Sequence, residues 1–185
     1  MKKYLLFLGL ILLFSCKEET QVKTAPTQVS ESIESETEQV TDLNTTTTQV
    51  DVVFENEQFT TIYKAYLSVK AALVNTNPTT TQTVVVNMRD EVSKLYKAEN
   101  LMEALNTMAA SDEISVQRKA FEQVSGIMEI LIAGQKIVSG SVYKQYCPMA
   151  FDGKGAFWLS DSDEIRNPYF GDQMLKCGVV NKEIQ

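Results

Sequence analysis

Histidine is absent from the 185 residues, and cysteine occurs only three times. Histidine is the commonest metal ligand and the usual general base beside a serine or cysteine nucleophile. Its absence excludes histidine-based zinc or copper(II) sites and every Ser-His or Cys-His arrangement. No glycine loop has the spacing that holds phosphate before a helix, and no pair of carboxylates is marked out for acid-base chemistry. We therefore predict that the protein is not an enzyme.

Basic residues are also few, because 17 Lys and Arg face 24 Asp and Glu, which gives a formal net charge of -7. A chain of this charge is not attracted to the phosphates of nucleic acid or to anionic lipid headgroups. We expect no nucleic-acid partner. Any attachment to a membrane must come from something other than a basic surface.

Long apolar runs are missing except at the start, where residues 4–14 are almost wholly apolar and follow Lys2 and Lys3. A membrane-spanning helix needs roughly 20 apolar residues, so this run is too short to remain in a bilayer. A short basic start, an apolar run and a small residue are typical of a secretory signal. Residues 1–15 are therefore predicted to be a signal peptide that is removed.

The residues at the predicted cleavage site resemble the lipobox of bacterial lipoproteins: Leu13, Phe14, Ser15 and Cys16. The resemblance implies that Cys16 becomes the new N-terminus and carries acyl chains, palmitate among them. Two or three such chains anchor a protein durably. We expect an outer-membrane lipoprotein, on the periplasmic face or on the cell surface. Residues 17–19 resemble a surface-export signal but also suit the start of an acidic linker.

Residues 16–50 are predicted to be a disordered tether that follows the lipidated cysteine. Thr, Ser, Glu and Gln supply 22 of the residues in 17–50, and the segment has no aromatic residue. Such a composition buries too little apolar surface to offset the entropy of ordering. The remaining residues, 51–185, match the size of one domain.

The first part of this domain has the apolar spacing of amphipathic helices. A helix is predicted over residues 57–74, and Asn77-Pro78 interrupts the pattern before a second helix that Thr79 can cap. Helical spacing continues through 101–108, and Ser111 is predicted to cap a further long helix with Asp112 and Glu113 in its first turn. Four methionines in these helices are interpreted as core residues: Met88, Met102, Met108 and Met128.

The last third has a different character, since residues 142–177 hold seven of the sixteen aromatic residues and three of the eight glycines. We predict a mostly α fold: an antiparallel bundle of three to four helices with an irregular, aromatic-rich C-terminal cap that can hold a short β-hairpin. Asp161, Asp163 and Glu164 lack the spacing of a calcium loop and indicate a solvated turn.

Cys147 and Cys177 lie in this cap, and each has a methionine within three residues, Met149 and Met174. Thiolate and thioether ligands favour Cu(I) and other soft ions. Three alternatives remain open: a soft-metal site made of Cys147, Met149, Met174 and Cys177, a disulfide that closes a 31-residue loop, or two free thiols. Both a bridge and a shared site require the two cysteines to be neighbours.

Four blocks in order, residues 142–150, 155–160, 165–171 and 174–178, resemble the family called domain of unknown function 3347. With the preceding helices the resemblance covers about residues 55–182. It implies a helical domain of the kind found in small lipoproteins and fused to adaptor subunits of copper and heavy-metal efflux pumps. A metal-efflux adaptor or pump is therefore the partner that the resemblance implies.

A second resemblance is to the short heavy-metal-binding module of such pumps, whose first half Tyr146, Cys147, Pro148 and Met149 fit. Ala150 stands where that module has a histidine, and the second half occurs here in another order, so the ligand set differs. Together these resemblances predict a lipoprotein that binds Cu(I) or another soft ion for sequestration or for hand-off to an efflux system. The alternative is a protein-interaction module without metal, stapled by a Cys147–Cys177 disulfide.

Overall fold

The computed structural model describes residues 41–185. The predicted signal peptide, the lipidated Cys16 and most of the predicted tether lie outside the described residues and stay predictions. Within the described part, no helix is both long enough and apolar enough to cross a membrane.

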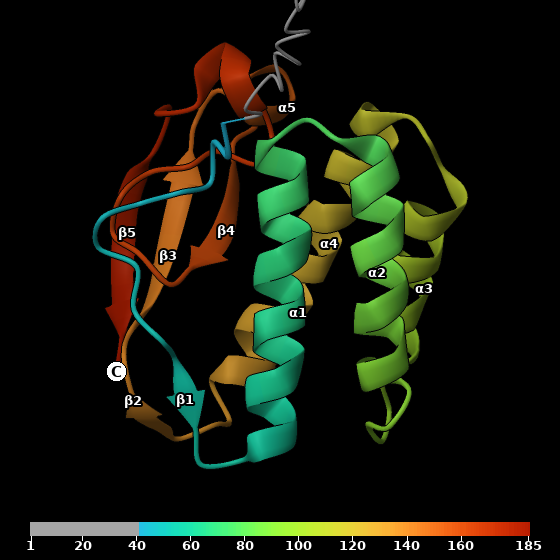
Figure 1. Ribbon diagram of the computed structural model, residues 1–185, viewed down its shortest axis with the longest axis vertical. Helices are drawn as coiled ribbons and strands as arrows, with labels where there is room; N and C mark the ends of the chain where they lie inside the picture. Colours follow the sequence, from blue (N-terminus) through green and yellow to red (C-terminus); the bar gives the residue numbers. More distant parts are fainter. Residues whose placement is uncertain (1–40) are drawn as a thin grey trace, which may run out of the picture. The chain divides into compact units, whose positions relative to one another are not determined.

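The architecture is a four-helix bundle packed beside two small antiparallel sheets (Figure 1). The fold class predicted from the sequence is confirmed, with a larger sheet than a single hairpin. The long helices follow one another in the chain: α1 (Glu57–Val74), α2 (Pro78–Val92), α3 (Glu99–Ala110) and α4 (Ile114–Ile132).

The boundaries of α1 agree with the predicted helix. Asn56 caps it, because its side chain accepts a hydrogen bond from the backbone N–H of Phe59. The apolar side chains recur every three or four residues and are buried, among them Ile62, Tyr66 and Leu73. The apolar spacing therefore sufficed to predict this helix, and the structure adds its cap.

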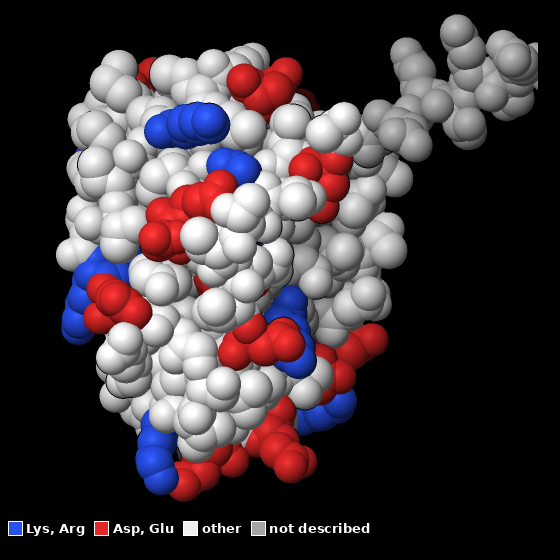
Figure 2. All heavy atoms as spheres, turned by 60° about the vertical axis from the view of Figure 1, so that its left-hand side comes forward, with Lys and Arg blue, Asp and Glu red and all other residues white. Residues whose placement is uncertain are grey.

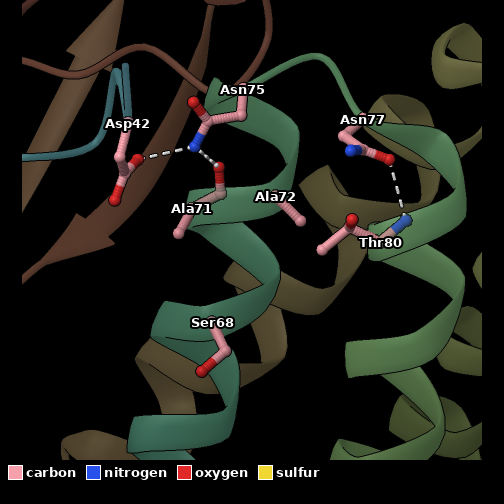
Figure 3. A pocket seen from close by; sticks show the side chains of 7 residues that line it. All are labelled: Asp42, Ser68, Ala71, Ala72, Asn75, Asn77 and Thr80. Atoms are coloured by element: carbon pink, nitrogen blue, oxygen red, sulfur yellow. Dashed lines mark hydrogen bonds between the residues drawn. The ribbon is translucent and has the colours of Figure 1, made fainter. Parts of the chain in front are cut away.

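The start of α2 differs from the prediction, since Asn77 and not Thr79 is the cap. The Asn77 side chain accepts a hydrogen bond from the Thr80 N–H, and Pro78 occupies the first helical position (Figure 3). Proline suits that position because its missing N–H has no partner there anyway. The valine-rich interior remains helical because Val85, Met88 and Val92 are fully buried in the bundle.

The prediction for the start of α4 is two residues early. The helix begins at Ile114 with Glu113 before it, so Asp112 and Glu113 precede the first turn that they were predicted to occupy. Ser111 does act locally, but its hydroxyl accepts from the Glu113 N–H in the preceding turn. Met88, Met108 and Met128 are fully buried, as predicted, and Met102 is half-buried.

The C-terminal part forms a three-stranded sheet in the order β4-β3-β5, built from β3 (Val142–Cys147), β4 (Ala156–Ser160) and β5 (Val179–Ile184). Between β3 and β4 the turn Ala150–Gly153, labelled α5 in Figure 1, holds Phe151 and Asp152 in left-handed conformations. A short 3-10 helix, Gly171–Met174, precedes β5. The second sheet pairs β1 (Val53–Phe54) with β2 (Ile137–Ser139).

Aromatic side chains join the sheet to the helices. Tyr66 of α1 stacks on Phe121 of α4, and its hydroxyl accepts a hydrogen bond from the Leu159 N–H of β4. Tyr169 packs edge-on against Trp158, and both are buried. The aromatic residues of the cap therefore form part of a core shared with the bundle.

Residues 42–50, which we call the strap, run along the domain although composition assigned them to the tether (Figure 1). The strap is held by hydrogen bonds instead of apolar burial, which is why its composition did not reveal it. Asp42 accepts from the Asn75 amide, as Figure 3 shows, and the Arg166 guanidinium donates to the Thr45 carbonyl. Further contacts join the strap to residues 161–164, through Thr47, Thr48, Gln49 and Val50.

Acidic and basic side chains lie interspersed on the face that includes the sheet (Figure 2). No continuous basic stripe is visible on that face of the described residues. This agrees with the acidic composition of the chain.

Candidate site at the cysteine pair

The two cysteines of the cap are neighbours in the fold, 30 positions apart in the sequence. Their sulfur atoms lie 2.6 Å apart. Cys147 is fully buried and Cys177 is half-buried. The adjacency that a bridge or a shared site requires is therefore confirmed.

The sheet register produces this approach. Cys147 is the last residue of β3, and Cys177 comes two residues before β5, whose Val179 pairs with Tyr146. Gly178 lies between Cys177 and β5. Its φ is +153°, and a Cβ there would stand 2.9 Å from the Trp158 ring. The missing side chain at Gly178 lets the start of β5 pass close enough to bring the sulfurs together.

Asn167 holds the backbone around Cys177, a role that the sequence did not reveal. Its amide donates to the Cys177 carbonyl at 2.7 Å, and its own N–H donates to the Leu175 carbonyl. Its side-chain oxygen accepts from the Tyr169 N–H, so the fully buried Asn167 has several partners. Asn-Pro at 167–168 indicated only a turn, and a turn signal does not identify the distant groups that the amide binds.

Burial raises the pKa of the Cys177 thiol, and the adjacent Cys147 raises it further. A hydrogen bond from the Met149 backbone N–H acts in the opposite direction. With its pKa raised, the Cys177 thiol is mostly protonated at neutral pH. It is therefore a poor nucleophile, which agrees with a structural pair better than with a catalytic one.

The geometry fits a shared metal ion poorly. An ion bound to both sulfurs at about 2.3 Å, with a tetrahedral angle between the bonds, needs the sulfurs roughly 3.7 Å apart. The pair would have to open by about 1 Å. Among residues 41–185, no group of three or more His, Cys, Asp or Glu side chains could hold a metal ion.

The two methionines of the predicted site are placed differently from each other. Met149 is 56% exposed, and Met174 is half-buried in the short 3-10 helix. Met149 therefore faces solvent beside the pair and is not packed in the core. Val179 and Val180, which follow Cys177, are also exposed.

A buried ion pair was missed by the sequence analysis. Asp161, predicted to lie in a solvated turn, is 4% exposed, and its carboxylate lies 3.8 Å from the ammonium group of the buried Lys70. Lys70 also donates to the Ser160 hydroxyl at 3.0 Å. The prediction for Asp161 was wrong because the strap covers it: Gln49 donates to its carboxylate and Val50 to its carbonyl.

Comparison with known families gives a match over part of the chain. The family described as "Protein of unknown function (DUF3347)" matches residues 62–140, which run from within α1 to the end of β2. The resemblance stated from the sequence is confirmed over this range, although the four blocks that suggested it lie C-terminal to the match. Neither a curated protein nor a solved structure matches the chain.

Proposed function

We propose that this protein, which matches the DUF3347 family over residues 62–140, is a lipid-anchored protein-interaction module whose C-terminal cap is stapled by a Cys147–Cys177 disulfide. The observation that carries the proposal is the 2.6 Å separation of the two sulfurs. Lipids on Cys16 would hold the protein on the outer membrane. The predicted tether before the strap, residues 17–41, would allow a distance between the membrane and the domain.

The bridge suits both the geometry and the predicted location. The sulfurs need to approach by only about 0.5 Å to reach the length of a disulfide bond. To bind a shared ion they would have to separate by about 1 Å. Secreted proteins lie in an oxidising compartment, where neighbouring cysteines pair. A bridge across this loop contributes about 3–4 kcal/mol in the chain-entropy model.

Intact-mass measurement tests the bridge. The chain isolated without reductant should be lighter than the reduced chain by the mass of two hydrogens, and reduction should lower the free energy of unfolding by about 3–4 kcal/mol. The double variant Cys147→Ser with Cys177→Ser should show no response to reductant. Two alkylatable thiols in the freshly isolated, unreduced protein would contradict the proposal.

The surface beside the bridge supports the interaction role. β5 is an edge strand of its sheet, and Val179 and Val180 at its start are exposed together with Met149. An edge strand offers unpaired backbone groups to an extended segment of another chain. We therefore propose that a partner segment adds to this sheet along β5. A metal-efflux adaptor or pump remains the candidate partner implied by the family resemblance.

Site-specific photo-crosslinking in cells tests this docking edge. A photoreactive residue at Val180 should give one discrete adduct, whereas the same residue at Val138 of β2 should give none. Val138 is a suitable control, because it is also an exposed valine in a strand. Val138 is 53% exposed and Val180 is 40% exposed. Equal labelling at both positions, or none at Val180, would argue against docking along β5.

Binding of Cu(I) by the reduced pair is our second proposal, favoured by the exposed Met149, whose backbone contacts Cys177. The sulfurs would have to separate to accept the ion. Reduced protein should then compete with a Cu(I) chelator, and Met149→Leu should weaken the competition while Met88→Leu, a change in the core, leaves it unchanged. Equal competition by the double cysteine-to-serine variant would remove this proposal.

A further inference from the structure

A pocket outside the cysteine site and the docking edge lies between α4 and the cap. Its volume is about 330 Å³. This is at the lower end of the range for small-molecule sites, roughly 300–1,000 Å³. One wall is the start of α4, with Ile114, Arg118 and Lys119, and the other is formed by the rings of Phe151, Tyr169 and Phe170.

The aromatic wall is built by an unfavourable backbone. Phe151 has φ and ψ of 51° and 56°, and Asp152 follows in the same left-handed region. Large side chains rarely adopt this conformation, and it persists only where the surroundings impose it. Here it places the Phe151 ring edge-on to Tyr169, 5.3 Å between centroids, and under the Lys119 ammonium group at 4.6 Å.

The pocket lining carries positive charge that it does not itself neutralise. It contains Arg118 and Lys119 and no carboxylate, in a chain that is acidic as a whole. Lys119 pairs with Glu122, one turn further along α4 and outside the lining. Among residues 41–185, no carboxylate lies within 4.0 Å of the Arg118 guanidinium, although the more distant Asp172 acts on its charge.

Arg118 is half-buried, and its hydrogen bonds go to neutral oxygens. Its guanidinium donates to the carbonyls of Pro168 and Leu73 and to the Thr76 hydroxyl. A partly desolvated cation next to an apolar pocket favours an anion that brings its own apolar surface.

We propose that this pocket binds a small aromatic carboxylate, whose ring lies against Phe151, Tyr169 and Phe170 and whose carboxylate meets Arg118 and Lys119. The three rings favour a flat apolar body, because aromatic groups pack well edge-on or offset. The two cations select the acid over its neutral amide. This ligand site goes beyond the interaction role and does not depend on the state of the cysteines.

Calorimetric titration of the full-length protein with indole-3-acetate and with indole-3-acetamide tests the proposal. The two probes share ring and shape and differ in charge. The acid should bind at least about tenfold more tightly than the amide, because hydrogen bonds to a charged group are the stronger ones. Phe151→Leu should weaken both probes together.

Lys119→Gln is the informative variant, because Arg118 also ties α1 to the cap and its loss would disturb folding. The change should weaken acid binding about three- to tenfold and leave the amide unaffected. Lys94→Gln is the matched control: Lys94 pairs with Glu91 three residues away, and the side chains are 57% and 27% exposed, against 58% and 32% for Lys119 and Glu122. Failure of both probes to bind, equal affinity for acid and amide, or an equal effect of both substitutions would overturn the proposal.

Discussion

Lys70 carries an ammonium group in the interior of the domain, 1% exposed, where Asp161 at 3.8 Å is its ionic partner. Burial lowers the pKa of Lys70 from 10.5 to about 8, while the charges of Asp161 and Asp42 raise it and that of Arg166 lowers it. Burying the charged form therefore costs stability that the ion pair only partly restores.

The stability of the protein should rise between pH 8 and pH 9.5. In this window the unfolded chain, in which the pKa of Lys70 is about 10.5, binds more protons than the folded one, so the free energy of unfolding increases with pH. The expected gain is about 1–2 kcal/mol. Chemical denaturation of the oxidised protein at several pH values measures it. Lys70→Met should flatten the curve, and a wild-type curve as flat as that of the variant would show that Lys70 does not titrate in the core.

At the scale of elements, local hydrogen-bonding geometry decides where the second helix begins. Asn77 accepts the Thr80 N–H, and the Thr81 hydroxyl donates to the Asn77 carbonyl. Thr79, one residue past Pro78, already lies inside the helix and is exposed. The two residues therefore have opposite roles although both are good capping types.

Substitution of each residue by alanine separates these roles. Asn77→Ala should lower the free energy of unfolding by about 1 kcal/mol, because an N–H at the helix start loses its acceptor. Thr79→Ala should leave stability unchanged or raise it by a few tenths of a kcal/mol, because alanine is the better helix former. Thermal or urea denaturation of the two variants measures the difference. A larger loss of stability in Thr79→Ala than in Asn77→Ala would show that Thr79 is the cap.

The helices could be predicted from the sequence because their signal is periodic and local. The apolar spacing of residues 57–74 is sufficient to define α1. The three-stranded sheet could be anticipated only as a possible hairpin, since the partner of β3 on its other side, β5, lies more than 30 residues further along the chain. The same long-range pairing brings Cys147 to Cys177, so the adjacency could be stated only as a requirement of the site.

At the scale of the whole molecule, the strap shows what composition cannot reveal. A segment rich in threonine has little apolar surface to bury, yet hydrogen bonds to Glu164, Arg166 and Asp161 hold it on the domain. These three side chains lie in the loop after β4. The position of that loop beside the strap depends on the tertiary fold and is not visible in the sequence. The tether assigned to residues 16–50 remains a prediction for the part that precedes the strap.

Deletion of residues 42–50 should destabilise the domain by about 2–4 kcal/mol, because it uncovers Asp161, the ionic partner of Lys70, and removes the hydrogen bonds that Gln49 and Val50 donate to it. Deletion of nine residues from the predicted tether, 17–25, should leave the free energy of unfolding unchanged. Urea denaturation of the two shortened chains compares them directly. Equal stabilities would mean that the strap adds nothing to the fold.

The order of contacts along the strap determines how the domain responds to a pull from its N-terminal side. As the strap advances from Thr45 through Thr47 to Val50, its partners retreat from Arg166 through Glu164 to Asp161. A pull directed away from the domain surface and applied before residue 42 therefore loads the contacts of Asp42 and Leu43 with Asn75 first and the other hydrogen bonds in turn, so that the strap peels. Full peeling adds up to about 30 Å of extended chain before α1 bears any force. If lipids on Cys16 hold the N-terminus at the membrane, release of the strap lengthens the connection to the domain. The domain can then follow a moving partner without unfolding.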